Sequence, residues 1–416
     1  MPRTLYICYF GVREPLVQTQ VIAYLREIQK GGTDVSLLTF EPARDSDAAD
    51  WDRPIREQLR SQGIDWHWLR YHKRFSVLAT AYDVFRGVMF VRSFIAKHRP
   101  EVLHGRIHVP TLMAALARKF SAHKPKLLFD IRGFFPEEYT DAGVWPANGW
   151  LYRMVKRVER WLLKESDGFV VLTNKARDIL FPESRETGHD KFGRPVEVIP
   201  CCVDFEKFKD AGEESRQSVR TELNVGDRTV ITYVGSFGGW YLTDEMLDLF
   251  SAAREHDPNT FALILTQRNH ERIEERLRER GFAESDYYVR GVPPGEIPRY
   301  LSGADVAISF IKACYSKLSS SPTKIAEYLA CGLPIISNRG VGDIDELLER
   351  TRTGSLINGF AREDYLESLA GLSLSPELSE RCRTTARNEF ELSDVGGVRY
   401  RRIYSELLKG SESETK

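Results

Sequence analysis

The stretch SSSPTKIAEYLACGLPIIS, residues 319–337, decides the fold expected for this chain. Ser321 followed by Pro322 predicts a helix start, because a serine oxygen can cap a helix and proline suits its first position. Gly332 predicts the end of that helix, and LPIIS (333–337) predicts a strand of a buried sheet. A helix that leads so directly into a buried strand is typical of α/β domains.

The first turn of this helix has the residues of a diphosphate site. Free backbone N–H groups and the helix dipole attract anions there, and Thr323 and Lys324 add a hydroxyl and a positive charge. Glu327 shares their face, where its carboxylate can accept hydrogen bonds from the two ribose hydroxyls of a nucleotide. An ordinary capped helix, with Lys324 and Glu327 as a surface ion pair, accounts for the same residues equally well.

Apolar runs of strand length continue on both sides of this stretch and alternate with helical patterns. Helices are expected from Pro15 to Gly31-Gly32, over 112–118 and over 149–164, whereas the polar segment 182–195 predicts a loop. The predicted strands are TLYICYF (4–10), DVSLLTF (34–40), EVLH (101–104), LLFDI (127–131), GFVVLT (168–173) and VEVIP (196–200), then VITYVGS (230–236), FALILT (261–266), YYVRG (287–291), DVAISF (305–310), LPIIS (333–337) and GSLIN (354–358). Two doubly wound α/β domains follow, with a ligand expected between them at the carboxyl ends of their strands. No G-x-G-x-x-G follows either first strand, which argues against a nicotinamide cofactor.

The order of these elements sets the expected domain boundaries. An N-terminal domain is predicted over 1–202, a C-terminal domain over 203–390, a helix returning to the N-terminal domain over 391–409, and a disordered tail over 410–416. Hydrophobic residues make up 42% and charged residues 29%, the balance of a soluble globular protein. Six cysteines without paired spacing, and no evident signal peptide or membrane span, lead us to expect a cytoplasmic protein.

The net charge of −1 hides an uneven distribution. Residues 1–200 carry 31 Lys and Arg against 24 Asp and Glu, and residues 201–416 carry 28 against 36. Basic and apolar residues mix in LRYHKRF (69–75) and FRGVMFVRSFIAKHR (85–99), where Phe85, Val88, Met89, Arg92 and Ile95 would share one side of a helix. The basic excess fits either a solvated surface or contact with an anionic membrane or a phosphorylated acceptor. Nucleic acid is not expected, since no binding motif accompanies the charge.

Several stretches resemble family 4 of the retaining glycosyltransferases, which have the GT-B fold. EYLACGLP (327–334) is similar to the second half of the family's donor motif, and VEVIPCCVDFEKF (196–208) is similar to its interdomain signature. VERWLLKESDGFVVLT (158–173) resembles the passage before that signature. Gly11 matches the glycine of the family's first loop, and YVGS (233–236) matches the strand that opens the second domain.

The resemblance implies two Rossmann-like domains facing a central cleft, with the acceptor bound by the N-terminal domain and the nucleotide-sugar by the C-terminal domain. It implies transfer of a sugar to an acceptor hydroxyl with retention of configuration, and no metal or other cofactor. The residues expected to bind the donor are Gly11, Gly235, Ser236, Thr266, Arg290, Ser321, Thr323, Lys324 and Glu327. Arg132 and Glu327 are the expected catalytic residues, and His104, Arg106 and Arg132 the expected acceptor or sugar contacts.

The chain departs from the family's pattern at three places. Ser319 stands where the first glutamate of the donor motif would fall, and Arg132 stands where a histidine is usual. The Arg and Lys that follow the YVG strand in the family are absent from GSFGGWYLTDEM (235–246), and Lys324 is expected to take over their contact with phosphate.

Other candidate residues have structural explanations beside functional ones. Arg132 can pair with Asp130 or Glu137, and a single His104 at a strand end is more often structural. The D-x-D pairs Asp45/Asp47 and Asp343/Asp345 are interpreted as loop or capping residues rather than metal ligands.

The predicted function is therefore glycosyl transfer from a nucleotide-sugar to a glycan, a lipid-linked acceptor or a small molecule, with possible peripheral contact with an anionic membrane. Two alternatives stay open. A GT-B epimerase would use the same diphosphate site but needs carboxylates near the anomeric carbon. A non-catalytic sugar-nucleotide-binding protein would be consistent with the missing first glutamate.

Overall fold

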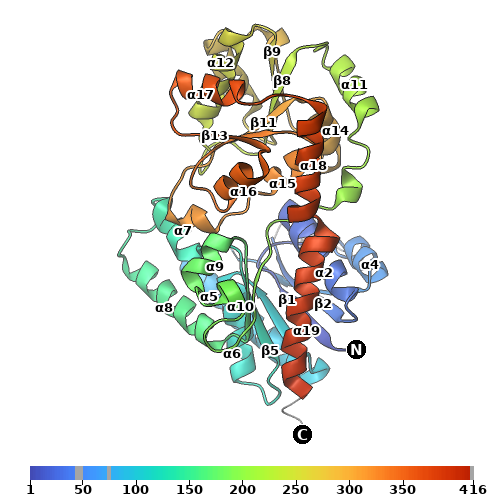
Figure 1. The fold of residues 1–416 in the computed structure, drawn as a ribbon. Helices are drawn as coiled ribbons and strands as arrows, with labels where there is room; N and C mark the ends of the chain where they lie inside the picture. Colours follow the sequence, from blue (N-terminus) through green and yellow to red (C-terminus); the bar gives the residue numbers. More distant parts are fainter. Residues whose placement is uncertain (43–49, 73–75, 413–416) are drawn as a thin grey trace. The chain divides into compact units, whose positions relative to one another are not determined.

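The computed structural model describes residues 1–42, 50–72 and 76–412. It divides into two compact units, each with one parallel sheet (Figure 1). Unit 1 comprises Met1–Pro200 together with Leu392–Lys416, and unit 2 comprises Cys201–Glu391. The two sheets, each covered by helices, confirm the predicted doubly wound α/β class.

Unit 1 contains a seven-stranded sheet in the order β3-β2-β1-β4-β5-β6-β7. Neighbouring strands are parallel, and the order reverses between β1 and β4, where ligands of such sheets commonly bind. The strands are β1 Arg3–Ile7, β2 Asp34–Glu41, β3 Ile64–Arg70, β4 Val102–Arg106, β5 Lys126–Ile131, β6 Gly168–Val171 and β7 Val196–Val198.

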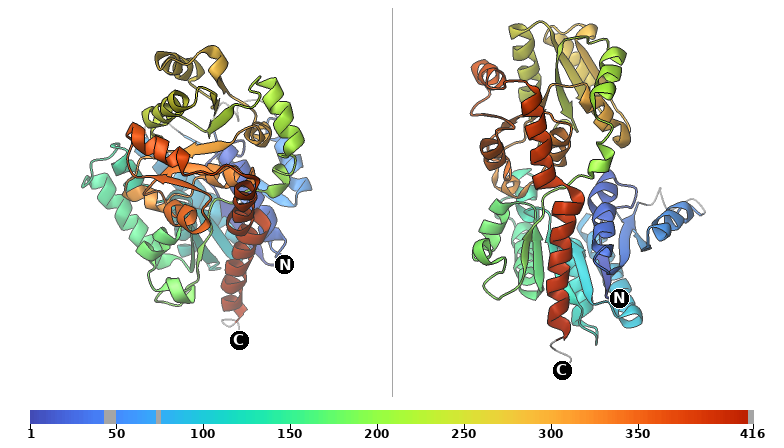
Figure 2. Two further views of the ribbon diagram at one scale, coloured as in Figure 1. Left: turned by 45° about the horizontal axis from the view of Figure 1, so that its top comes forward. Right: turned by 45° about the vertical axis from the view of Figure 1, so that its right-hand side comes forward.

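The helices of unit 1 pack on this sheet and on one another. Helix α2 lies beside α19, which comes from the end of the chain (Figure 2). Helix α5 packs on α6, and α6 packs in turn on α8. The helices are α1 Pro15–Val17, a π-helix Gln18–Ile22, α2 Ala23–Gln29, α4 Arg53–Ser61, α5 Ser76–His98, α6 His108–Lys119, α7 Phe135–Asp141, α8 Trp150–Glu165, α9 Asn174–Leu180, α10 Ser184–Thr187, a second π-helix Leu392–Gly397 and α19 Val398–Glu412.

Unit 2 contains a six-stranded parallel sheet in the order β10-β9-β8-β11-β12-β13. Its strands are β8 Thr229–Val234, β9 Thr260–Leu265, β10 Tyr287–Arg290, β11 Val306–Ser309, β12 Ile335–Asn338 and β13 Gly354–Ile357. Its α-helices are α11 Glu213–Glu222, α12 Thr243–His256, α13 His270–Glu279, α14 Ile297–Ser302, α15 Thr323–Ala330, α16 Ile344–Thr351, α17 Arg362–Ala370 and α18 Pro376–Phe390. Single 3₁₀ turns occur at Phe205–Lys207, Glu284–Asp286, Pro294–Glu296 and Tyr315–Ser319.

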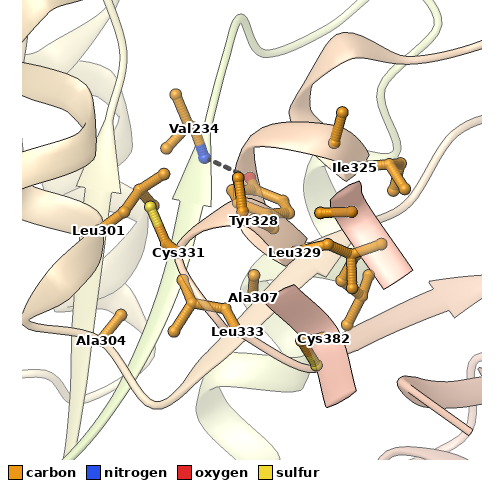
Figure 3. Close-up of a cluster of buried hydrophobic side chains, with 14 of the residues drawn as sticks. Val234, Leu301, Ala304, Ala307, Ile325, Tyr328, Leu329, Cys331, Leu333 and Cys382 are labelled. Carbon is orange, nitrogen blue, oxygen red and sulfur yellow. Dashed lines mark hydrogen bonds between the residues drawn. The ribbon is translucent and has the colours of Figure 1, made fainter. Parts of the chain in front are cut away.

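The sheet of unit 2 is buried on both faces, because successive residues of its strands point to opposite sides. Val230 and Leu263 join one apolar cluster, whereas their neighbours Ile231 and Ala262 join another. Helix α15 packs into the first cluster through Ile325, Tyr328 and Leu329 (Figure 3). This packing explains why the strands are continuous apolar runs in the sequence.

Three sequence predictions about elements need correction. Strand β3 was not anticipated, because it has a neighbour on one side only and its sequence, IDWHWLR, mixes polar with aromatic residues. The predicted loop 182–195 contains the single-turn helix α10. Helix α19 extends to Glu412, so residues 410–412 of the predicted disordered tail are helical, while 413–416 lie outside the described residues.

Candidate functional site

Helix α15 begins at Thr323, and Pro322 takes the N-cap position without a side-chain cap. Ser321 instead accepts, through its Oγ, a hydrogen bond from the backbone N–H of Cys201 at 3.0 Å. The prediction that Ser321 caps the helix is wrong, because its side chain lies one residue too early. The backbone N–H groups of the first turn therefore have no capping side chain and point toward any ligand at this helix end.

Lys324 lies in this first turn with an unpaired, buried ammonium group. Lys324 is 8% exposed, and within the described parts of the chain its Nζ has no hydrogen-bond partner. The Nζ lies 4.1 Å from the ring centroid of Tyr233 and 4.3 Å from that of Tyr241, a separation typical of cation–π contacts. The predicted alternative, a surface ion pair between Lys324 and Glu327, is therefore wrong.

Gly235 follows β8 and lies directly beside the Lys324 side chain. A Cβ on Gly235 would lie 2.7 Å from the Lys324 Nζ, and the φ of Gly235 is +140°, which other residues rarely adopt. The glycine thus lets the end of β8 approach the ammonium group closely. The structure brings these two predicted donor residues together.

One hydrogen bond joins α15 to β8 at this position, and a second fixes the segment after β8. The backbone N–H of Val234 donates to the Tyr328 hydroxyl at 2.8 Å (Figure 3), and the Tyr233 hydroxyl donates to the carbonyl of Ser236 at 2.6 Å. Sequence reasoning missed Tyr233 and Tyr241 as neighbours of Lys324. The only signal was their position on either side of the glycines at 235, 238 and 239.

Burial governs the charges of the two titratable groups on α15. It lowers the pKa of Lys324 to about 7, against the opposing effect of Glu327. Burial also raises the pKa of Glu327, although Lys324 and Lys207 both oppose this. A bound anion beside Lys324 would restore its positive charge, so this arrangement can hold a phosphate through one strong, charge-assisted contact.

The remaining predicted donor residues of unit 2 have contacts of their own. Thr266 is buried after β9 and donates to the carbonyl of Arg268 at 3.2 Å. Arg290 is exposed at the end of β10 and forms an ion pair with Glu274 at 2.7 Å. Both side chains bond to residues other than Lys324, and their contribution to donor binding stays a prediction.

Unit 1 holds the predicted acceptor contacts in a buried polar cluster. His104 is fully buried, and its Nδ1 lies 3.0 Å from the Tyr404 hydroxyl of α19. Arg106 donates to the carbonyl of Gln20 at 3.2 Å. The guanidinium of Arg132, 4% exposed, lies 3.6 Å from the Asp130 carboxylate. The three predicted residues are brought together facing inward, and direct contact with an acceptor stays a prediction.

Asp130 is the anion at the centre of this cluster. Its Oδ2 accepts a hydrogen bond from the Tyr400 hydroxyl at 3.1 Å. Burial opposes its ionisation, yet Arg132, His104 and Arg106 together hold the pKa of Asp130 below its usual range. Burial lowers the pKa of His104. The cluster thus ties the ends of β4 and β5 to the C-terminal helix α19.

Other sequence candidates take structural places. Gly11 lies beside Glu41, whose Oε2 would be 2.9 Å from a Cβ at that position. Ser319, at the position of the missing glutamate, is buried and donates to the carbonyl of Ser316 at 2.7 Å. Asp345 lies in the first turn of α16 and accepts hydrogen bonds from the backbone N–H of Gly340, so it is a helix residue that holds the preceding loop. Asp45 and Asp47 lie outside the described residues.

Helix α5 presents an apolar stripe among basic side chains. The exposed residues of the stripe are Leu78, Tyr82, Phe85 and Met89, spaced as on one helix face. Arg86 and Arg92 are exposed on the same helix. Ile95, which the sequence placed on the side of Phe85, is buried instead. Within the described ranges, no helix combines the length and apolar character that a membrane crossing requires.

Comparison with known families gives two matches. Residues 17–184 match the family described as the glycosyl transferase 4-like domain, and residues 215–389 match glycosyl transferases group 1. Together the two matches cover most of both units.

Two curated relatives are similar over part of their length. One is a GDP-mannose-dependent alpha-(1-6)-phosphatidylinositol monomannoside mannosyltransferase of Mycolicibacterium smegmatis, 24% identical over 39% of this chain and 43% of the relative. The other is a 2-deoxystreptamine glucosyltransferase of Streptomyces kanamyceticus, 26% identical over 46% of this chain and 47% of the relative. The chain thus spans less than half the length of each.

Solved structures share the fold over nearly the whole chain. A glycosyltransferase from Rickettsia africae has a TM-score of 0.70 at 16% identity and covers 98% of this chain and 99% of its own. Anabaena Alr3699/HepE, solved in complex with UDP, has a TM-score of 0.66 at 13% identity and covers 99% of this chain and 100% of its own.

Proposed function

Since this chain is a family 4-like glycosyltransferase of the GT-B fold, we propose that it moves a sugar from a nucleotide-diphosphate-sugar donor to an acceptor hydroxyl with retention of configuration. The observation that carries the proposal is the buried Lys324 Nζ, which has no hydrogen-bond partner among the residues that the structure describes. Leaving a buried donor unsatisfied costs about 1–3 kcal/mol. A diphosphate at the first turn of α15 would satisfy it.

In this proposal unit 2 stabilises the leaving group. Lys324 and the backbone N–H groups of the first turn of α15 contact the diphosphate, where negative charge grows as the bond to the sugar breaks. Glu327 receives the ribose hydroxyls of the nucleotide. A leaving phosphate oxygen takes the proton of the attacking hydroxyl on the same face of the sugar, which gives retention without a side-chain base. No step requires a metal ion.

Unit 1 is proposed to receive the acceptor, which is a glycan, a lipid-linked sugar or a small molecule. The name of the first relative includes phosphatidylinositol monomannoside, a glycolipid, and this supports a lipid-linked acceptor. The apolar stripe of α5, flanked by Arg86 and Arg92, supports peripheral contact with an anionic membrane. We place this contact at the cytoplasmic face.

A donor and acceptor screen tests the proposed reaction. The purified chain would be incubated with GDP-mannose or UDP-glucose and with phosphatidylinositol monomannoside or 2-deoxystreptamine, and the release of nucleoside diphosphate would be followed. Proton NMR of the product reports the anomeric configuration. Epimerised nucleotide-sugar, or binding without any release of nucleoside diphosphate, would contradict the proposal.

A further inference from the structure

The carboxyl edge of the sheet in unit 1 holds a histidine–aspartate pair that the proposed reaction does not yet use. His72 follows the end of β3, and Asp83 is a fully buried residue of α5. The predicted acceptor contacts His104 and Arg106 point into the interior. His72 is half-buried, with 39% of its side chain exposed, and so has a surface that a ligand can reach.

Three parts of unit 1 meet at the Asp83 carboxylate. Its Oδ1 faces the His72 Nδ1 at 2.6 Å. Its Oδ2 accepts hydrogen bonds from the Tyr9 hydroxyl at 2.6 Å and from the backbone N–H of His72 at 3.0 Å. Asp83 thus joins the segment after β1, the segment after β3 and helix α5, and it fixes the His72 ring in one orientation.

This orientation decides which nitrogen of His72 is free. Because Nδ1 faces a carboxylate, which can only accept, Nδ1 is the nitrogen that carries a proton toward Asp83, and Nε2 is the nitrogen that can face a ligand. No hydrogen bond joins Nε2 to any residue within the described ranges. In catalytic triads a buried carboxylate likewise holds one ring nitrogen of a histidine, and the other ring nitrogen faces a hydroxyl.

Aromatic rings surround the pair. Tyr82, an exposed residue of α5, packs against the His72 ring with centroids 5.1 Å apart. Tyr71 packs against Tyr9 with centroids 5.3 Å apart. Aromatic rings with polar tips are suited to molecules that present both hydroxyls and C–H surfaces, as sugars and cyclitols do.

We propose that His72 Nε2 accepts a hydrogen bond from a hydroxyl of the acceptor, a sugar or cyclitol, and that Asp83 is the positioning residue for this contact. The contact is non-covalent. It rests on the proposed function in that unit 1 receives the acceptor. It adds a binding residue on the exposed edge of the sheet, apart from the buried cluster of His104 and Arg106.

Histidine NMR of the full chain tests the contact directly. The protein would be labelled with ¹⁵N-histidine, saturated with UDP or GDP, and titrated with methyl α-D-mannopyranoside or myo-inositol. The His72 signal is identified by its loss in the His72→Asn variant. We expect the Nε2 resonance of His72 to move saturably with at least one probe, while that of His67 stays fixed. No movement with either probe would overturn the proposal.

A matched pair of variants separates this role from a structural one. In His72→Asn the amide can still donate to Asp83, but the Nε2 position is lost. With the donor and acceptor that turn over in the screen, we expect the acceptor KM to rise about tenfold, the worth of one hydrogen bond. The Kd for UDP or GDP should keep its wild-type value, because the proposed nucleotide site lies in unit 2. His67→Asn is the control, because His67 faces Asp65 at 3.1 Å in a separate His–Asp pair within β3.

The outcomes distinguish the two proposals. If nucleoside diphosphate binds and is released but His72→Asn keeps the wild-type acceptor KM, the contact at His72 is wrong and the transferase proposal stands. If nucleoside diphosphate does not bind at all, the proposed donor site is wrong, whatever the result at His72.

Discussion

Folding alone does not explain the surroundings of Lys324. Its ammonium group is buried between Tyr233 and Tyr241 without a hydrogen-bond partner, although a methionine of similar length would fill the same space without a polar group. Cation–π contacts recover part of the cost of burial. A ligand that accepts a hydrogen bond from the Lys324 ammonium group would offset the rest of the cost of burial.

The Lys324→Met variant should separate binding from stability. We expect the affinity for UDP or GDP to fall by about 1.5–3 kcal/mol, the worth of a charge-assisted hydrogen bond. The free energy of unfolding without nucleotide should be equal or higher, because an unpaired buried amine is removed. Calorimetry and urea unfolding measure the two quantities. Lys209→Met, at an exposed lysine of the same unit, is the control, and unchanged affinity in Lys324→Met would contradict the assignment.

The pH dependence of nucleotide binding should report the same group. The pKa of Lys324 is about 7 in the empty protein, whereas the pKa of a lysine in an unfolded chain is about 10.4. Between these values the unfolded chain binds a proton that the folded chain lacks, so this residue's contribution to stability becomes more favourable as pH rises above 7. Nucleotide binding should show the opposite trend, weakening above pH 7 because the amine must first take up a proton.

Titration calorimetry in buffers of different ionisation enthalpy measures this proton uptake. Near pH 8 we expect uptake approaching one proton per nucleotide in the wild type and little in Lys324→Met. Equal uptake in both proteins would assign the proton to another group.

Among the elements, α5 combines two surfaces. Its inner face buries Val91, Phe94 and Ile95 within unit 1, while Leu78 and Phe85 of the stripe are exposed. The only acidic residue of α5, Asp83, is buried, so the exposed charges of the helix are basic. An apolar stripe flanked by basic residues is typical of helices that lie on anionic membranes.

Charge reversal on α5 should weaken membrane contact. Each basic residue near an anionic bilayer contributes about 1 kcal/mol, so Arg86→Glu with Arg92→Glu should lower the partition coefficient at least tenfold. Co-sedimentation with phosphatidylserine-containing vesicles measures it, and binding should decline as salt rises. Arg272→Glu with Arg278→Glu, exposed on α13, is the control. Equal recovery with neutral and anionic vesicles would remove the membrane from the proposal.

In the whole molecule, the chain leaves unit 1 after Pro200 and returns to it at Leu392. The returning segment supplies α19, whose Tyr400 and Tyr404 hold Asp130 and His104. The stability of the N-terminal sheet therefore depends on the last residues of the sequence, while the Lys324 site lies wholly within unit 2.

Deleting residues 392–416 should affect the two units differently. Unit 1 loses the partners of a buried ionic cluster, and we expect a loss of several kcal/mol of its stability. Nucleotide binding by unit 2 should persist. Differential scanning calorimetry and titration with UDP or GDP measure the two effects, and a variant that keeps unit 1 folded with unchanged stability would show that α19 is dispensable.

Chelation provides a separate test of the diphosphate site. If Lys324 and the first turn of α15 are sufficient for the leaving diphosphate, turnover should persist in EDTA. Loss of turnover that magnesium or manganese restores would show that the site is incomplete without a cation.

The sequence by itself determined the order of strands and helices, because continuous apolar runs and helical periodicity are local properties. It also indicated the helix after Pro322 and the position of Lys324 within its first turn, since capping and proline preferences act over a few residues. It did not predict β3, an edge strand with polar residues, or the true role of Ser321, which bonds to distant Cys201.

Only the tertiary structure decided which residues surround each charge. Lys324 meets Tyr233 because α15 packs against β8, and Asp83 meets Tyr9 and His72 because α5 packs beside the strands. His104, predicted at a strand end, lies within β4, and it faces the Tyr404 hydroxyl of α19, which comes from the far end of the chain. Spacing along the chain fixes which face of an element a residue occupies, but the elements that cover that face are selected by long-range packing.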